Sequence, residues 1–167
     1  KYNENEILNY LKDDYYIICD RYVSSNMAHQ GSKIKNDEER TECFDMTRGL
    51  PFDDNFTDLM ICDLSLHYFT EKTTFEILEE IKRVLKPSGL LLFRVNSVRD
   101  VNHGAGEGNE IEPHLYETSD GRYKRFFDQL DIEKFFAEWE KLYVHEETMG
   151  RYEKEKILWR CAMQVKK

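Results

Sequence analysis

Three short apolar segments of this chain each end in an aspartate, and this repeated pattern constrains the fold more than any other feature. The segments are residues 15–19 before Asp20, residues 41–44 before Asp45, and residues 59–62 before Asp63. Short apolar runs are typical of parallel strands that are buried on both faces. Ligands of open α/β sheets bind beyond the carboxyl ends of such strands. The pattern therefore predicts three carboxylates at a ligand-binding edge, although an aspartate can equally cap the turn that follows.

The segments that follow alternate between helix and strand patterns. A helix is expected over residues 5–12, and a second one begins at Thr73 or Thr74, where apolar residues recur every three or four positions. Pro87 and Gly89 end the second helix, because proline cannot continue the hydrogen-bond ladder. Residues 90–95 then form the next strand. Residues 96–122 contain many turn-forming residues and are expected to form a long loop.

The C-terminal third predicts one more helix and two strands. Asp131 opens a helix whose apolar face extends to Trp139. Residues 141–147 and 157–165 read as an antiparallel pair, because apolar residues alternate with polar ones in the second segment. The predicted fold class is α/β: an open, mostly parallel sheet that ends in an antiparallel strand pair, within a single domain over residues 1–167.

Composition narrows the classes of partner. With a net charge of -9 over 167 residues, the chain would repel nucleic-acid phosphates, so we expect no nucleic-acid partner. Its longest apolar run is far shorter than the ~20 residues that span a bilayer, so we expect no membrane partner and a cytoplasmic location. The four cysteines are widely spaced and are expected to be buried and reduced, without a metal site.

The middle of the chain carries a recognisable succession of residues. It consists of Asp45-Met46 with Leu50-Pro51-Phe52, then Asp63-Leu64-Ser65-Leu66-His67-Tyr68, then Arg83-Val84-Leu85-Lys86-Pro87-Ser88-Gly89 before an apolar strand. This succession resembles the middle and C-terminal part of class I S-adenosylmethionine-dependent methyltransferases, over about residues 42–165. The resemblance implies a Rossmann-like methyltransferase sheet and S-adenosylmethionine as the cofactor.

The resemblance also implies roles for individual residues. Cofactor binding is expected from three strand-end acids and two neighbouring residues, namely Asp20, Asp45, Met46, Asp63 and Leu64. Asp63 and His67 are the candidate catalytic residues, and His67 can equally be a structural histidine. Tyr68, Tyr123 and Arg125 are the candidate substrate-binding residues, with Tyr68 also fitting the wall of a pocket.

One feature of the family is absent from this sequence. No first strand with a G-x-G-x-G loop precedes Asp20, and such a loop lets backbone amides approach the methionine moiety. Gly104, Gly106 and Gly108 match the letters of that loop but do not stand between a strand and a helix. We expect this glycine stretch to be a lid over the acceptor pocket or a plain loop, and the isolated chain to bind S-adenosylmethionine weakly or not at all.

Residues 15–42 carry a second resemblance. The run Cys19-Asp20-Arg21-Tyr22 and the residues up to Lys33 resemble the Asp-Arg-Tyr segment of thymidylate kinase. This resemblance implies that Asp20 and Arg21 position phosphates, while Ser25 and Gln30 lie along a monophosphate acceptor. The kinase P-loop is absent, so a working kinase is not expected. Two explanations of this resemblance remain. The chain is a chimera joined near Glu42, with a kinase-like segment over residues 1–41 and a methyltransferase-like core over residues 42–167, or the resemblance to thymidylate kinase is coincidental.

Three functions remain open at this stage. The leading one is a methyltransferase-like domain that transfers a methyl group to an unknown small-molecule acceptor. The alternatives are a non-catalytic, truncated or chimeric remnant and a nucleotide-binding fragment related to thymidylate kinase. A missing first strand would leave sheet edges unpaired, so we also expect a homo-oligomer.

Overall fold

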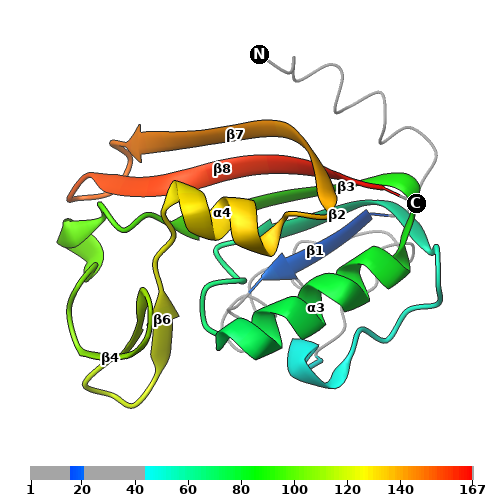
Figure 1. The fold of residues 1–167 in the computed structure, drawn as a ribbon. Coiled ribbons are helices and arrows are strands. Elements are labelled where there is room, and N and C mark those ends of the chain that lie inside the picture. Colours follow the sequence, from blue (N-terminus) through cyan, green and yellow to red (C-terminus); the bar gives the residue numbers. More distant parts are fainter. Residues whose placement is uncertain (1–15, 21–43, 167) are drawn as a thin grey trace, which may run out of the picture.

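The computed structural model describes residues 16–20 and 44–166, which form two sheets and two helices longer than one turn (Figure 1). The larger sheet has the strand order β1-β2-β3-β8-β7. Its strands are β1 (Tyr16–Asp20), β2 (Thr57–Asp63), β3 (Leu85–Asn96), β8 (Lys156–Val165) and β7 (Trp139–Met149). β1, β2 and β3 pair in parallel, whereas β8 is antiparallel to both β3 and β7. The predicted α/β class, an open and mostly parallel sheet ending in an antiparallel pair, is confirmed.

β1 lies directly beside β2, with Asp20 opposite Asp63. On the other side of β2, Asp63 is opposite Arg94 of β3. The sheet therefore has no gap between the two aspartate-ending strands, and within the described part of the chain its outer strands are β1 and β7. Because the prediction of a homo-oligomer depended on such a gap, it stays a prediction without support from the sheet.

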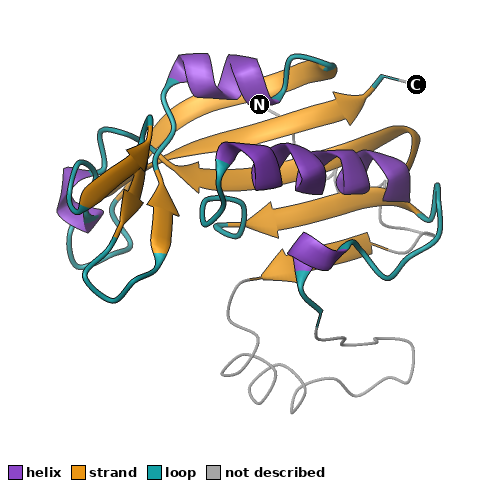
Figure 2. Ribbon diagram, turned by 60° about the horizontal axis from the view of Figure 1, so that its bottom comes forward, coloured by secondary structure: helices purple, strands orange, loops and turns teal. Residues whose placement is uncertain are grey.

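Helix α3 (Glu71–Val84) connects β2 to β3 and lies on the same face of the sheet as α4 (Gln129–Phe135) (Figures 1 and 2). The N-cap of α3 is Thr70, whose side chain accepts a hydrogen bond from the amide of Thr73. The sequence-based start at Thr73 or Thr74 is therefore a few residues late. Several threonines compete for the cap position in this segment, and sequence alone does not separate them.

The expected turn over residues 86–89 is present, but as an irregularity inside β3. Leu85 pairs with Thr57, and the next paired residue, Leu90, lies opposite Leu59. Ser88 adopts a positive φ of 63°, which is uncommon outside glycine. The intervening residues thus bulge out of the ladder, and the predicted strand over residues 90–95 continues from there.

Helix α4 is shorter than predicted. Asp128 is its N-cap, and Asp131 completes a capping box by accepting a hydrogen bond from the Asp128 amide. Trp139, which was expected on the helix, begins β7 instead. Its ring system still faces the core, with a centroid 6.1 Å from that of Phe136. The apolar spacing that predicted one long helix therefore marks buried residues of a helix, a turn and a strand.

The core lies between the two helices and the sheet. It includes Ile77, Leu78 and Ile81 from α3, Ile132 and Phe135 from α4, and Met60, Cys62, Leu91, Phe93, Cys161 and Met163 from the strands. Cys62 and Cys161 are buried and free, as expected, and burial raises the pKa of Cys161 to about 12. Burying such apolar side chains contributes roughly 1.5–3 kcal/mol each.

A second, smaller sheet replaces the expected long loop over residues 96–122. It consists of β4 (Asn109–Glu112), β5 (Leu115–Glu117) and β6 (Tyr123–Arg125), preceded by the short helix η2 (Val101–His103). The amide of Arg125 donates to the carbonyl of His67 at 2.7 Å and so ties this sheet to the segment that follows β2. The loop prediction was wrong because these strands are short and polar and show no apolar periodicity.

The segment before β2 also differs from the prediction. Phe44 and Asp45 are not in a strand; Asp45 caps the short helix η1 (Met46–Arg48) and accepts hydrogen bonds from the amide and the hydroxyl of Thr47. Residues 41–43, the helix expected over residues 5–12, and the kinase-like residues Arg21, Ser25 and Gln30 lie outside the described residues.

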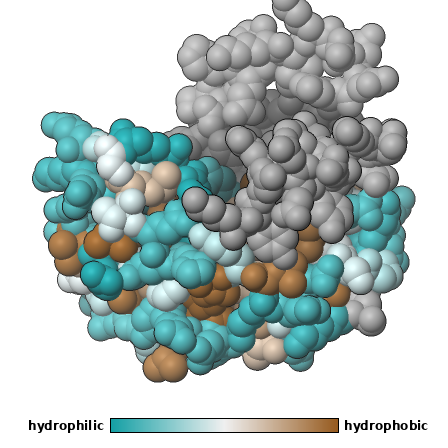
Figure 3. All heavy atoms as spheres, turned by 90° about the horizontal axis from the view of Figure 1, so that it is seen from above, coloured by the Kyte–Doolittle hydropathy of each residue, from teal (hydrophilic) through white to brown (hydrophobic). Residues whose placement is uncertain are grey.

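The surface seen from above in Figure 3 is mostly hydrophilic where it is described, with hydrophobic side chains in separate places. None of the helices in the described ranges has the length and apolar character needed to cross a membrane.

Candidate functional site

A cleft of about 680 Å³ lies at the carboxyl ends of β2 and β3. Asp63, Leu64 and Asn96 line it at the strand ends, and His67 and Tyr68 follow β2. The opposite wall comes from the β5–β6 turn, and the rim includes residues around the β7–β8 turn. This is the edge at which open α/β sheets bind ligands.

Asp63 is held in place by a bidentate ion pair. Nε and Nη2 of Arg94, on the neighbouring strand, each lie 2.5 Å from one carboxylate oxygen of Asp63. These hydrogen bonds raise the pKa of Arg94, whose Nη1 also contacts the sulfur of Met149 at 3.4 Å. A carboxylate has about four lone-pair sites, so Asp63 can still accept hydrogen bonds from a ligand. This geometry suits an anchoring group better than a group that takes a proton.

Leu64 has an unusual backbone conformation, with φ at 52° in the left-handed region. Its amide donates to the carbonyl of Arg94 at 3.1 Å, which fixes the chain direction directly after β2. A bulky residue rarely adopts this conformation, and such strain is found most often at ligand-binding sites. Leu64 therefore marks the point at which the chain turns along the cleft.

His67 and Tyr68 line the cleft beside these strand ends. The His67 side chain belongs to a residue that is 2% exposed, and its ring centroid lies 4.1 Å from that of Tyr68. A hydrogen bond from Arg125 holds the His67 carbonyl. The imidazole is therefore a rigidly placed group that reaches the cleft from the core side.

Asn96 was not among the residues singled out from the sequence. It ends β3, is 1% exposed and lines the cleft. Within residues 16–20 and 44–166, neither Oδ1 nor Nδ2 of this side chain has a hydrogen-bond partner. Buried polar groups are nearly always paired in native structures, so an unpaired carboxamide in a cleft is a candidate for ligand contact.

The rim of the cleft carries positive charge in an acidic protein. Its cationic side chains are Arg122, Lys124, Arg151 and Lys156, and its acidic side chains are Asp63 and Asp120. Hydrogen bonds from Arg122 and then from Thr118 hold the pKa of Asp120 below its ordinary value. The residues that line the cleft thus include more cations than acids, although Arg122 pairs with Asp120 and Lys156 pairs with the buried Asp100.

Lys156 reaches the cleft from a buried ion pair. Its Nζ lies 3.0 Å from Oδ2 of Asp100, whose side chain is fully buried. The other carboxylate oxygen accepts a hydrogen bond from the Ile157 amide at 3.0 Å and lies 3.0 Å from Nδ1 of His103. This cluster attaches the start of β8 to the segment after β3 and so fixes one side of the cleft.

Five of the residues predicted from the sequence meet in this cleft: Asp63, Leu64, His67, Tyr68 and Tyr123. Asp45 and Met46 lie at η1 and are not among the residues that line it. The backbone of Asp20 ends β1 beside Asp63, and its side chain lies outside the described part of the structure. The glycines at positions 104, 106 and 108 do not line the cleft either; the wall above it comes from the β5–β6 turn instead.

Arg125 requires a correction, because its guanidinium group faces the protein interior. The residue is 1% exposed, and its side chain pairs with Glu112 at 2.5 Å and donates to the carbonyl of Pro113 at 3.1 Å. Arg125 therefore holds β4 and the following turn against β6 and does not line the cleft.

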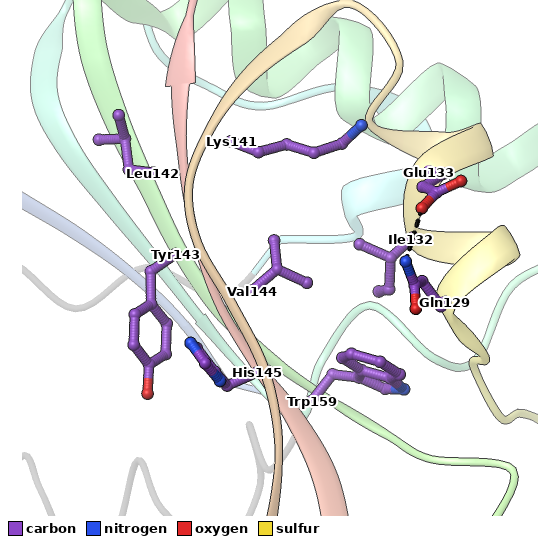
Figure 4. Close-up of a pocket in the computed structure, with 9 residues that line it drawn as sticks. All are labelled: Gln129, Ile132, Glu133, Lys141, Leu142, Tyr143, Val144, His145 and Trp159. Atoms are coloured by element: carbon purple, nitrogen blue, oxygen red, sulfur yellow. Dashed lines mark hydrogen bonds between the residues drawn. The ribbon is translucent and has the colours of Figure 1, made fainter.

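Two other features of the described residues carry less chemistry. A hollow of about 370 Å³ lies between α4 and β7 (Figure 4), where Gln129 donates to Glu133 at 2.8 Å and Val144 faces Ile132. Figure 4 shows Tyr143 on the other side of β7. Three potential metal ligands, His114, Asp128 and Asp131, lie close together, but both aspartates already cap α4.

Comparison with known proteins identifies the family of this chain. Residues 5–93, just over half of the chain, match the methyltransferase domain family, and the chain belongs to this family. This match runs through the segment that resembles thymidylate kinase. The chain is also 30% identical over 107 residues to the tRNA N(3)-methylcytidine methyltransferase Mettl2 of Drosophila melanogaster, which covers 60% of this chain and 33% of that protein. The chain thus spans about a third of the length of this curated relative.

Solved structures show the same fold. A SAM-dependent methyltransferase from Methanosarcina mazei has a TM-score of 0.73 and 15% identity, covering 96% of this chain and 97% of its own. The 1,6-didemethyltoxoflavin-N1-methyltransferase of Burkholderia thailandensis, solved with bound 1,6-didemethyltoxoflavin and S-adenosylhomocysteine, has a TM-score of 0.65 and 15% identity. The match covers 91% of this chain and 61% of that chain. The family is one of S-adenosylmethionine-dependent transferases, so S-adenosylmethionine is the cofactor of this class of domain.

Proposed function

We propose that this domain transfers a methyl group from S-adenosylmethionine to a small-molecule acceptor bound in the cleft beyond β2 and β3. The cleft itself carries the proposal. Its volume of about 680 Å³ lies in the range of about 300–1,000 Å³ that is typical of small-molecule sites. Its position at the carboxyl ends of parallel strands is the one that α/β folds use for ligands.

The β1–β2 side of the cleft fits the cofactor. Asp63 presents a partly exposed carboxylate, and Leu64 turns the chain directly beside it. Asp20 ends the adjacent strand at the same level. We assign these residues to the cofactor, because strand-end carboxylates can accept hydrogen bonds from ribose hydroxyls or an adenine amino group. Asp45 and Met46, which lie at η1 before β2, are assigned to the cofactor from the family resemblance alone.

The residues beyond β2 fit the acceptor. When bound, the cofactor supplies a methyl group on a positively charged sulfur, so the protein has mainly to align the acceptor with that methyl group. His67 is the group that we assign to accepting a proton from the acceptor, because Asp63 is occupied by Arg94. Tyr68 and Tyr123 would form the walls that hold the acceptor in line.

Binding of S-adenosylhomocysteine, measured by thermal shift at rising ligand concentration, tests the cofactor assignment. We expect weak binding, so that Tm rises only at S-adenosylhomocysteine concentrations above the dissociation constant. Replacing Asp63 with Asn or Asp45 with Ala should weaken it by about 1–3 kcal/mol. Asp58→Asn is the matched control, because Asp58 lies near the other end of β2 and pairs with Lys86. Equal weakening by the Asp58 and Asp63 substitutions would refute the site.

A second candidate substrate is a cytidine in tRNA. It is favoured by the similarity to Mettl2 over 107 residues and by the cationic side chains at the rim of the cleft, whereas the net charge of -9 opposes it. Transfer of tritium from labelled S-adenosylmethionine distinguishes the two candidates. Label in bulk tRNA that ribonuclease releases supports the RNA substrate, and label in a fraction of small metabolites supports the small-molecule substrate.

A further inference from the structure

We propose that Asn96 binds the methyl acceptor and that the acceptor presents a hydrogen-bond donor and a hydrogen-bond acceptor side by side. This inference rests on the proposed function, and it names the chemical class of the acceptor. It starts from a buried carboxamide in the cleft, for which the described residues provide no hydrogen-bond partner at either Oδ1 or Nδ2.

The fold does not need this carboxamide for its own stability. The backbone of Asn96 is already fixed on two sides, by pairing with Leu158 of β8 and by a hydrogen bond of 2.8 Å from the Phe127 amide to its carbonyl. An unpaired buried amide destabilises a folded protein, and an apolar side chain of the same shape would not. The side chain is thus rigidly placed and unfavourable for folding, which is the expected state of a group that completes its hydrogen bonds with a ligand.

The chemistry of a carboxamide defines its partner. Oδ1 accepts hydrogen bonds and the adjacent amino group donates them, so a matching ligand offers a donor next to an acceptor. A primary amide has this arrangement, and so has a heterocycle with an amino group beside a ring nitrogen or a carbonyl. A carboxylate or a ketone satisfies only the amino group and leaves Oδ1 unpaired, and a site of this kind rejects such analogues strongly.

The position of Asn96 assigns it to the acceptor and not to the cofactor. Asp63 and Leu64 lie toward β1, whereas Asn96 lies toward β8, opposite Leu158. Tyr152 and Lys156, which precede and begin β8, line the cleft on this second side. A cofactor anchored at Asp63 would therefore leave the Asn96 side of the cleft to the molecule that receives the methyl group.

The first test compares the stability of two variants without ligand. Asn96→Leu removes the unpaired carboxamide and keeps its approximate shape, so we expect Tm to rise by about 2–4 °C. Asn102→Leu is the matched control, because the exposed Asn102 side chain already donates to the Glu155 carbonyl at 3.0 Å and does not line the cleft. We expect no rise in Tm for this control. If Tm of Asn96→Leu instead falls, by as much as or more than Tm of Asn102→Leu, the Asn96 carboxamide has a structural role and the proposal is overturned.

The second test uses three ring compounds that differ in one group: nicotinamide, nicotinate and 3-acetylpyridine. Each is titrated into ¹⁵N-labelled protein saturated with S-adenosylhomocysteine, and the side-chain NH₂ signals of Asn96 are followed. We expect nicotinamide to move these signals at a concentration at least about tenfold lower than the other two compounds. Equal responses to all three compounds, or no response to nicotinamide, would overturn the proposal.

The binding of S-adenosylhomocysteine separates this inference from the proposed function. We expect Asn96→Leu to leave its dissociation constant within about twofold. We also expect it to weaken nicotinamide binding at least about tenfold, measured in both proteins at the backbone amide signal of Tyr68, which lines the same cleft. A loss of more than about tenfold in S-adenosylhomocysteine affinity would place Asn96 at the cofactor and overturn the inference alone. Absence of any S-adenosylhomocysteine binding to the unsubstituted protein would refute the proposed function. The titration with the three ring compounds, repeated without S-adenosylhomocysteine, would still test the role of Asn96. Asn96→Ala replaces the leucine variant if that variant does not fold.

Discussion

The ion pair between Asp63 and Arg94 fixes a carboxylate at the floor of the cleft, and its loss should be measurable as stability. Arg94→Met keeps most of the aliphatic stem and removes the guanidinium group, together with two hydrogen bonds of 2.5 Å. The side chain of Arg94 is 17% exposed and that of Asp63 is 43% exposed. Exposed pairs contribute about 0.2–1 kcal/mol and broken buried pairs cost about 3–5 kcal/mol, so a value near 2 kcal/mol is expected here.

For a chain of this length, 2 kcal/mol corresponds to a fall in Tm of roughly 4–8 °C. Urea unfolding of Asp63→Asn, Arg94→Met and the double variant gives the coupling energy directly. We expect a coupling of about 1–2 kcal/mol, because each single variant leaves the partner without its bidentate contact. Changes in the midpoint without changes in the slope would show that the native fold is retained.

Arg160→Met supplies the control for this measurement. Arg160 lies on β8, pairs with Glu147 at 3.1 Å and has a side chain that is 49% exposed. Its loss should cost less than about 1 kcal/mol, as for other surface pairs. Additive effects of the two substitutions at Asp63 and Arg94, or equal losses for Arg94→Met and Arg160→Met, would refute the view that the cleft holds its carboxylate by a specific ion pair.

Two further predictions concern the support of the site. Gly108→Ala should destabilise the protein by about 2 kcal/mol or more in a thermal unfolding assay. The reason is that φ of Gly108 is +104° and an added Cβ would overlap the Glu117 carbonyl. Gly121→Ala is the control and should cost less, because Gly121 has a φ of +75° and open space around it. Hydrogen bonds from Arg83 hold the pKa of Glu80 below its ordinary value of 4.5. Its carboxylate therefore stabilises the fold above that pH and loses this contribution as the pH falls through the lowered pKa, so Glu80→Gln should flatten the decline of Tm between about pH 5 and pH 3. An unchanged decline would contradict this.

Sequence patterns predicted the large sheet well, because its strands and helices have strong apolar periodicity. The alternation in residues 157–165 gave β8, and the spacing of Leu78, Ile81 and Leu85 gave α3 up to its last turn. The small sheet had no comparable signal. β4 reads Asn-Glu-Ile-Glu and β6 reads Tyr-Lys-Arg, and such short polar strands form only because tertiary contacts such as the Arg125–Glu112 pair hold them.

The candidate site was predicted only partly from the sequence. The reason is that the rule for polar residues at strand ends was applied to acids alone. Asp63 was identified as the polar residue that ends an apolar strand, and Asn96 ends β3 in the same way. Applied to every polar residue at a strand end, the same rule would have identified Asn96. Arg125 was chosen for its charge, but sequence does not reveal that Glu112 and the Pro113 carbonyl satisfy this charge inside the protein.

Two local departures from folding rules lie at the same edge of the sheet, although others, such as the positive φ of Ser88, lie elsewhere. Leu64 has a strained left-handed backbone after β2, and Asn96 leaves a buried carboxamide unpaired among the described residues at the end of β3. Each departure costs on the order of 1–3 kcal/mol. A domain that only needed to fold would gain stability from glycine at the first position and leucine at the second. Their meeting in one cleft, beside a carboxylate fixed by Arg94, is therefore better explained by a ligand-binding methyltransferase site than by a non-catalytic remnant.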